Sequence, residues 1–372
     1  MLNNPRTTVI LLLLVLTFVV SLLGGALGNA FGLGFLATSL PAIQLPAELV
    51  VKLGPFPLMN TMITTWLAMV VLLVITFFTT RKLNEVPGRL QALLEVAIEF
   101  FLGLCESVAG KERARKFFPL VFTIFLFVVV ANWMGILPGF GTVGRVADVE
   151  EIAHHKGVHN YHDPALKLHD TASAHGGTRS AATDGHGVDL NNVKLHVFDS
   201  IGPLNVMLPG SLSEEIDFSD YEEQHGDIGK NKTAGHLVPF LRSANTDVNM
   251  TLAMAIVAML MVHFWGFSIL GFFGHIAKFI NFKEGPIGFF VGILEIISEM
   301  AKVISFTFRL FGNIFAGEVL LMAMAFLLPL IGIVPFLGVE LFVGIIQAFI
   351  FSMLTLVFAA MASVGHSEGG HN

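Results

Sequence analysis

Charged residues are scarce in this chain of 372 residues. Lys, Arg, Asp and Glu make up 13% of it, about half of what a soluble domain carries. Cysteine occurs once, as Cys105, so an intrachain disulfide is excluded. No GxxxxGK[ST] loop is present, which leaves nucleotide chemistry to partner chains. No internal repeat with paired broken helices is found either, which disfavours a stand-alone transporter.

Long apolar blocks are abundant, and hydrophobic residues make up 54% of the chain. A helix of about 20 mostly apolar residues crosses a bilayer. Helices are expected because lipid offers no hydrogen-bond partner to an open strand edge, and a transmembrane barrel shows short alternating segments instead. We predict an all-α integral membrane protein with about six membrane helices, from the blocks at 9–36, 62–79, 117–136, 252–273, 286–328 and 336–364.

The first 110 residues contain three further kinds of segment. Residues 1–40 read as a signal anchor or extra transmembrane helix, favoured over a cleaved signal peptide because the apolar run is long. Four prolines at 40–58 indicate a connector. Residues 90–109 are apolar but carry Glu95 and Glu99 one turn apart, which predicts an amphipathic helix at the membrane interface.

Basic clusters predict the orientation, because short loops rich in Lys and Arg stay cytoplasmic. The clusters at 81–89 and 111–116 flank the amphipathic segment and place both its ends inside. Residues 141–240, with 15 Asp/Glu against 7 Lys/Arg, then lie outside. Lys278 and Lys283 lie inside again, and the C-terminus is cytoplasmic.

The block at 286–328 is about 64 Å long if it is helical, about twice the hydrocarbon thickness. It therefore crosses twice or forms one long tilted helix. At about 100° per residue, four further polar residues fall within about 40° of Glu295 round the helix. A break for a second crossing has no reason to keep this register, so we predict one tilted helix with a polar stripe made of Glu295, Glu299, Lys302, Arg309 and Asn313.

Arg309 is the residue in this stripe with the strongest chemical implication. A guanidinium keeps its proton at any ordinary pH. Intramembrane ionisable residues are costly and are functional by default. The alternatives are a structural pair with Glu295 or Glu299, or snorkelling from a helix end.

Six motifs in order resemble subunit a of F-type ATP synthases, over about residues 58–140 and 239–364. They are RLFGN at 309–313 with AGE at 316–318, VPG at 86–88 with LQ at 90–91, the run from Pro119 to Pro138, TDVN at 246–249, LEIIS at 294–298, and QAFIF at 347–351.

The resemblance implies a stationary, non-catalytic subunit without cofactors. Two aqueous half-channels would pass protons to and from carboxylates on a ring of c subunits, and Arg309 would separate them. Its partners would be the c-ring, subunit b and other subunits of the complex in a bacterial plasma (inner) membrane, with no nucleic acid. Protons are the expected ion, although the c-ring mostly selects it. The remaining hypotheses are a stand-alone transporter or channel, and a metal-binding module with a membrane anchor.

The resemblance also assigns roles to individual residues. It places Glu318 and Glu340 in the outer half-channel, Gln347 near Arg309, and Asn313 beside them in the translocation path. Glu318 follows Arg309 by nine residues, roughly 180° round a helix, so it faces a different compartment; Glu340 is alternatively an interfacial residue. The channel lining further includes Asp247 and Asn249 at the outer mouth, where Asp247 is equally suited to cap a helix, and Glu295 and Lys302 at the inner exit.

The insertion at 141–240 departs from the family, and ten of the 14 histidines lie there. His154 or His155 with His159 approximates the spacing of zinc or copper ligands. No cysteine or HExxH supports it, so we predict no metal and favour partner contact, packing on nearby subunits or proton buffering. The predicted organisation is 1–40 anchor, 41–140 helix, interfacial hairpin and next helix, 141–240 acidic extracytoplasmic insertion, and 241–372 channel helices.

Overall fold

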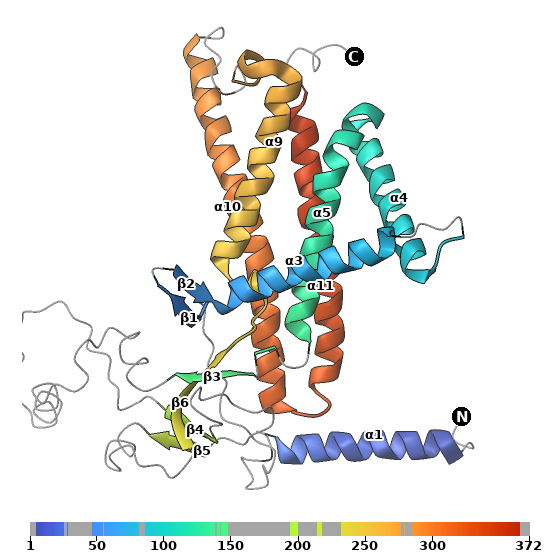
Figure 1. The fold of residues 1–372 in the computed structure, drawn as a ribbon, viewed down its shortest axis with the longest axis vertical. Helices are drawn as coiled ribbons and strands as arrows, with labels where there is room; N and C mark the ends of the chain where they lie inside the picture. Colours follow the sequence, from blue (N-terminus) through green and yellow to red (C-terminus); the bar gives the residue numbers. More distant parts are fainter. Residues whose placement is uncertain are drawn as a thin grey trace, which may run out of the picture. The chain divides into compact units, whose positions relative to one another are not determined.

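A computed structural model describes residues 5–25, 28, 47–54, 56–81, 86–137, 140–141, 143–147, 194–199, 214–217, 232–276, 279 and 285–364. Long helices make up most of it (Figure 1). They are α1 (Pro5–Gly24), α3 (Asn60–Thr80), α4 (Arg89–Ala109), α5 (Lys111–Ile136), α9 (Val248–Ile276), α10 (Gly285–Leu327) and α11 (Ile333–Ala362), with the short 3-10 helix η3 (Ala244–Thr246) before α9.

Five helices in this part of the chain, α3, α5, α9, α10 and α11, are long and apolar enough to cross a membrane. The chain is therefore a multi-pass membrane protein. The sixth predicted span falls on α1, whose apolar segment Thr8–Gly24 is shorter than the other five. The amphipathic segment predicted at 90–109 forms α4, which does not meet the same criteria of length and composition.

The predicted long helix is confirmed, because α10 runs for 43 residues from Gly285 to Leu327 without a break. Its polar stripe therefore belongs to one continuous element. The two-crossing alternative is wrong.

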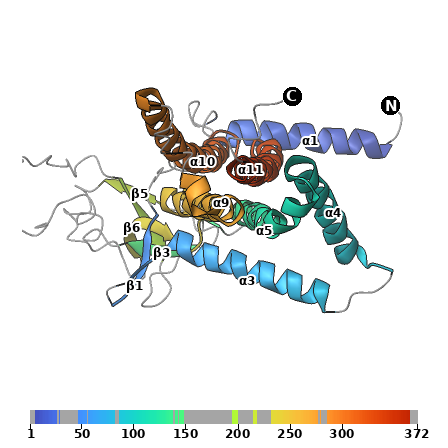
Figure 2. The ribbon, with the colours of Figure 1, turned by 90° about the horizontal axis from the view of Figure 1, so that it is seen from above.

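The chain divides into two compact units, and the larger one holds all the long helices. Within it, α11 packs on α5, α9 and α10, as the end-on view in Figure 2 shows. One apolar cluster joins α4, α5, α9 and α11, and a second joins α5, α9, α10 and α11. The second cluster contains Phe306, Leu310 and Ile314 of α10.

Helix α9 is interrupted at Gly271, whose backbone lies at φ 73° and ψ 166°. A positive φ of this kind is easy only for glycine. The interruption redirects the last turn of α9, so that His275 packs against Gly266 instead of lying further along the same axis.

The smaller unit spans Glu48–Asn60 and Pro138–Leu241 and contains strands that the sequence did not predict. Strands β1 (Leu49–Leu53) and β2 (Phe56–Met59) pair antiparallel within the proline-rich connector. Strands β3 (Gly144–Ala147), β4 (Lys194–Asp199), β5 (Glu214–Asp217) and β6 (Lys232–Pro239) form an antiparallel sheet in the order β3-β6-β4-β5. Part of the acidic insertion is therefore a β-sheet.

Candidate functional site

Arg309 lies on the outward side of α10. The row formed by Phe306, Leu310 and Ile314 is buried in the helix bundle. Arg309 is about 100° round the helix from this row, and it is exposed in the isolated chain. Its Nη2 donates a hydrogen bond to Ser305 Oγ at 3.3 Å. Packing of the apolar row thus holds the guanidinium away from the bundle core.

A cavity of about 260 Å³ lies beside Arg309. Its polar lining comes from α10, and α11 contributes Leu354 and Phe358 to the apolar wall. The cavity extends along about three turns of α10, because Ser298 and Lys302 line it as well as Arg309. The full lining is Ser298, Ala301, Lys302, Ser305, Phe306, Arg309, Leu354 and Phe358.

The carboxylate next to this cavity belongs to Glu299, and it is paired with Lys302. Lys302 Nζ lies 2.6 Å from Glu299 Oε1 and 5.0 Å from the centre of the Phe358 ring. Within the described ranges, Arg309 forms no ion pair with a carboxylate, and Glu295 is half-buried one turn before Glu299. The structural pair of Arg309 with Glu295 or Glu299 is therefore not formed.

Glu318 is held by an arginine that the sequence analysis did not single out. Arg242 Nε donates to Glu318 Oε1 at 3.2 Å, and Arg242 Nη2 donates to Oε2 at 3.3 Å. The guanidinium side chain is 6% exposed and the carboxylate side chain 28%. Such a two-pronged, charge-assisted pair fixes both the position and the orientation of the carboxylate.

Glu340 is buried on α11 and packs directly on Gly317 of α10. A Cβ at position 317 would overlap its carboxyl group. Glu318 directly follows Gly317 on α10, so both carboxylates lie near the same contact of α10 with α11. The structure thus brings together the two residues assigned to the outer half-channel.

Two buried asparagines form a polar connection next to this pair. Asn245 Nδ2 donates to Asn132 Oδ1 at 2.7 Å, and Asn132 Nδ2 donates to the carbonyl of Gly344 at 3.1 Å. These bonds link η3, α5 and α11. Gln347, one turn further along α11, is half-buried, and Asn313 is exposed on α10; neither lines the cavity at Arg309.

Asp247 has the geometry of a helix cap. Its Oδ1 accepts a hydrogen bond from the backbone N–H of Asn249 at 2.9 Å, at the start of α9. Its Oδ2 accepts one from Thr61 Oγ1 of α3 at 2.9 Å. The side chain is buried, whereas Asn249 is exposed. Asp247 therefore ties α9 to α3 in addition to any role at a channel mouth.

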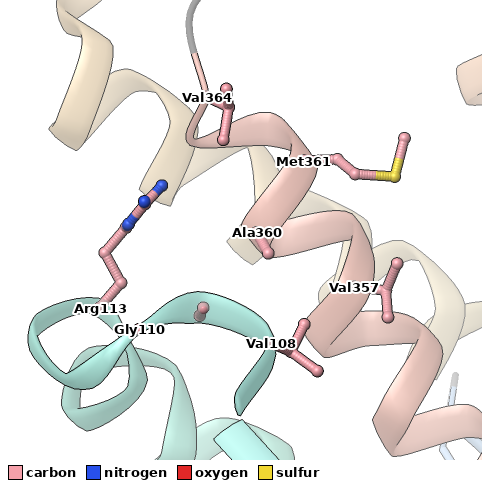
Figure 3. A pocket seen from close by; sticks show the side chains of 8 residues that line it. Val108, Gly110, Arg113, Val357, Ala360, Met361 and Val364 are labelled. Carbon is pink, nitrogen blue, oxygen red and sulfur yellow. The ribbon is translucent and has the colours of Figure 1, made fainter. Parts of the chain in front are cut away.

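A second cavity, of about 430 Å³, lies between the α4–α5 turn and the end of α11 (Figure 3). Arg113 is its one charged lining residue in this part of the chain, and it donates to the Ser363 carbonyl at 3.5 Å. The other lining side chains, among them Val108, Val357 and Met361, are apolar. The cavity lacks a carboxylate and so does not match the predicted ion path.

Sequence reasoning missed Arg242, Asn132 and Asn245 as members of this site. The sequence did indicate Arg242, because this cation lies four residues before the TDVN motif, on the side of the membrane where the acidic insertion is predicted. The asparagines gave no comparable signal, because Asn near a helix end usually caps or turns the chain. The histidine group at 154–159 lies outside the described residues.

Comparisons with known proteins show which family the chain resembles. The sequence pattern of the family described as ATP synthase A chain matches residues 62–153 and 227–360, more than half of the chain. The chain is 25% identical over 321 residues to ATP synthase subunit a of Moorella thermoacetica, covering 86% of this chain and 98% of that protein. It is 26% identical over 328 residues to ATP synthase subunit a of Gloeobacter violaceus, covering 88% and 93%, and 25% identical over 309 residues to that of Helicobacter pylori, covering 82% and 89%.

Proposed function

The chain belongs to the ATP synthase A chain family, the a subunits of F-type ATP synthases, and on that premise we propose that it is the stationary proton-channel subunit of a rotary ATP synthase. It is non-catalytic in this proposal, and ATP chemistry takes place on other subunits. Proton flow through it turns a ring of c subunits. Glu299 and Glu318 lie on either side of Arg309 along α10, and the two proton paths are assigned around them.

The outer half-channel is built around Glu318 and Glu340. Both carboxylates lie at the contact of α10 with α11, and Arg242 holds Glu318 from the segment before η3. A proton that arrives from outside is exchanged between these groups before it reaches the ring. Asp247 and Asn249 at the start of α9, with Asn313 and Gln347 nearer the ring, line the same route.

The inner half-channel is built around Lys302 and Glu299, with Glu295 one turn beyond. The cavity that Lys302 shares with Arg309 provides the space through which a proton leaves the ring. The outer and inner groups are then separated along α10 by Arg309 itself.

Arg309 separates the two paths because its charge is permanent. A ring carboxyl buried in lipid is neutral by desolvation, and it ionises when it passes a fixed positive charge. A bare cation cannot pass the same charge, so the two half-channels do not short-circuit. The membrane potential supplies about 2.3 kcal/mol per charge per 100 mV, which drives rotation only when this leak is blocked.

One observation carries the proposal: Arg309 faces outward from the bundle and has no carboxylate partner among the described residues. An unpaired guanidinium at this depth is costly. A carboxylate presented by another subunit removes that cost. The apolar side chains of Ile304 and Phe308, both more than half exposed, flank Arg309 on the same outward side and fit the apolar wall of a helical ring.

The proposal fixes topology and partners. The chain lies in a bacterial plasma membrane with the 141–240 insertion outside and the C-terminus in the cytoplasm. The c-ring contacts the exposed face of α10, and subunit b and other subunits of the complex contact the rest. No cofactor, metal or nucleic acid takes part.

Replacing Arg309 with Ala tests the proposal in inverted membrane vesicles that contain the whole complex. We expect coupled, ATP-driven proton pumping to be lost, and passive proton leak through the complex to rise, since the barrier between the paths is removed. Arg115→Ala is the matched control, because Arg115 is an exposed cation at the start of α5 that lines neither cavity. Undiminished coupled pumping by Arg309→Ala would refute the proposal.

A further inference from the structure

Two histidines of α9, His263 and His275, have no role in the function proposed above. His263 and His275 are twelve residues apart, which is about 18 Å in a continuous helix. Their ring nitrogens, His263 Nδ1 and His275 Nε2, are nevertheless 3.2 Å apart. The interruption at Gly271 makes this contact, because the last turn of α9 folds back on the preceding ones.

Space for the folded-back histidine is provided by Gly266. A Cβ at this position would overlap the imidazole of His275. The ring is 1% exposed and also contacts Phe267, with 4.5 Å between the ring centres. His275 is therefore fixed, and it holds the Nδ1 side of the His263 ring in one orientation.

The other nitrogen of His263 faces the carboxylate of Glu299. His263 Nε2 lies 3.7 Å from Glu299 Oε2, and Lys302 holds the opposite oxygen, Oε1, at 2.6 Å. Glu299 Oε2 is buried and has no hydrogen-bond partner among the described residues. The distance of 3.7 Å is too long for a direct hydrogen bond but suits exchange of a proton after a small side-chain movement or through one water.

The cluster connects two environments. Lys302 lines the cavity that contains Arg309, so Glu299 lies next to the place where the ring would release its proton. The side chain of His263 is 27% exposed and that of Glu299 is 18% exposed, so the histidine is the more open of the two. Glu299 contacts Lys302 on the side of the cavity and His263 on the other side. A route therefore leads from the Arg309 cavity through Glu299 to a half-open histidine.

We propose that Glu299 and His263 form the proton relay of the inner half-channel, with His275 as a positioning residue. The inference rests on the proposed function and gives the inner path its chemical groups. A proton leaving the ring binds Glu299 Oε2 and passes to Nε2 of neutral His263. The imidazolium then releases that proton from Nε2 to water on the inner side, so both groups return to their starting states. In ATP-driven pumping the same steps run in reverse.

Inverted vesicles that contain the whole complex test the relay, because the inner side faces the bath. The membrane potential built up on ATP addition is followed with an oxonol dye, since imidazole would itself dissipate a pH gradient. We expect Glu299→Gln and His263→Ala each to slow proton uptake by about tenfold or more, as for loss of a positioned acid–base group. Glu299→Asp retains part of the rate, and imidazole in the bath restores part of the rate of His263→Ala.

The positioning role of His275 has its own matched pair of variants. Gly266→Ala displaces His275 and should slow uptake, and imidazole should reverse part of this loss too because it replaces the misplaced relay group. Gly274→Ala is the control, since a Cβ there meets only Leu270 Cβ at an ordinary 3.5 Å. Glu99→Gln, on the exposed face of α4, is the control for loss of a carboxylate.

Two outcomes would overturn the relay. One is uptake by Glu299→Gln and His263→Ala within about twofold of the controls, far less than a lost acid–base group gives. The other is a loss in His263→Ala that imidazole leaves unchanged, which would make His263 a packing residue. Arg309→Ala in parallel separates the hypotheses: if it abolishes pumping while the relay variants pump normally, only the relay fails, and if it pumps normally, the proposed function fails.

Discussion

The contact between Gly317 and Glu340 allows a steric test of the outer half-channel without removing any titratable group. In Gly317→Ala, the new methyl would overlap three atoms of the Glu340 carboxyl group, Oε1, Oε2 and Cδ. Non-bonded atoms need about 3.5 Å, so the carboxylate has to move by on the order of 1 Å. Overpacking of this kind costs about 1–3 kcal/mol, and the better helix propensity of Ala offsets about 1 kcal/mol. The variant should therefore fold and assemble.

We expect Gly317→Ala to lower the rate of proton pumping more than it lowers the stability of the complex. A displacement of about 1 Å of a reacting group lowers rates by up to about 100-fold. We therefore expect ATP-driven proton pumping by Gly317→Ala, measured in inverted vesicles, to fall at least about tenfold, while the amount of assembled complex stays near that of the parent. Gly338→Ala on α11 is the matched control, because a Cβ there meets nothing within 4 Å.

A compensating change sharpens the experiment. Glu340→Asp shortens the side chain by one methylene and makes room for the methyl group at position 317. The double variant Gly317→Ala/Glu340→Asp should therefore pump faster than Gly317→Ala alone. Pumping by Gly317→Ala at the rate of Gly338→Ala, or a double variant that is slower than both single ones, would refute the reasoning.

Two further predictions concern stability and reactivity. Arg242→Gln should lower the free energy of unfolding by about 2 kcal/mol, because breaking a buried ion pair costs about 3–5 kcal/mol and the 28% exposure of Glu318 lets water offset part of it. Thermal unfolding of the purified complex checks this, Glu318→Gln should recover part of the loss in the Arg242→Gln background, and an unchanged melting temperature would contradict it. Burial raises the pKa of the Cys105 thiol from 9.0 to about 11, so the reactive thiolate is scarce between about pH 7 and pH 9. Maleimide labelling in native vesicles, read as a mass shift, should stay low over that range and become complete in detergent that unfolds the chain; full labelling of native vesicles at neutral pH would count against burial of this thiol.

The helical part of the fold was predictable from the sequence because helix geometry converts spacing into direction. The register of Glu295, Arg309 and Asn313 predicted one continuous helix, and α10 is continuous. Long apolar blocks predicted the membrane helices for the same reason: in lipid, length and composition decide most of the outcome. The strands around 194–199 and 232–239 were missed because short strands in an acidic, glycine-rich stretch give a weak pattern.

The partners of the site residues were much less predictable. Arg242 and Glu318 are 76 residues apart and meet only through tertiary packing. The contact of His263 with His275 depends on a backbone turn at Gly271 that no residue spacing predicts. Sequence spacing gave directions on one helix, and it gave no information about which side chain of another helix would meet them.

The unbroken helix α10 sets the distances between three proposed functional groups. The proposed inner acid, the charged barrier and the outer acid are all attached to it, with about 28 Å of rise between Glu299 and Glu318. Their spacing is therefore set by helical pitch and not by loops or packing. One residue added between Arg309 and Glu318 would turn the outer acid by about 100° away from Glu340. Insertions and deletions in this stretch would therefore change the spacing of these groups, whereas a longer connection between α5 and α9 leaves the rise along α10 unchanged.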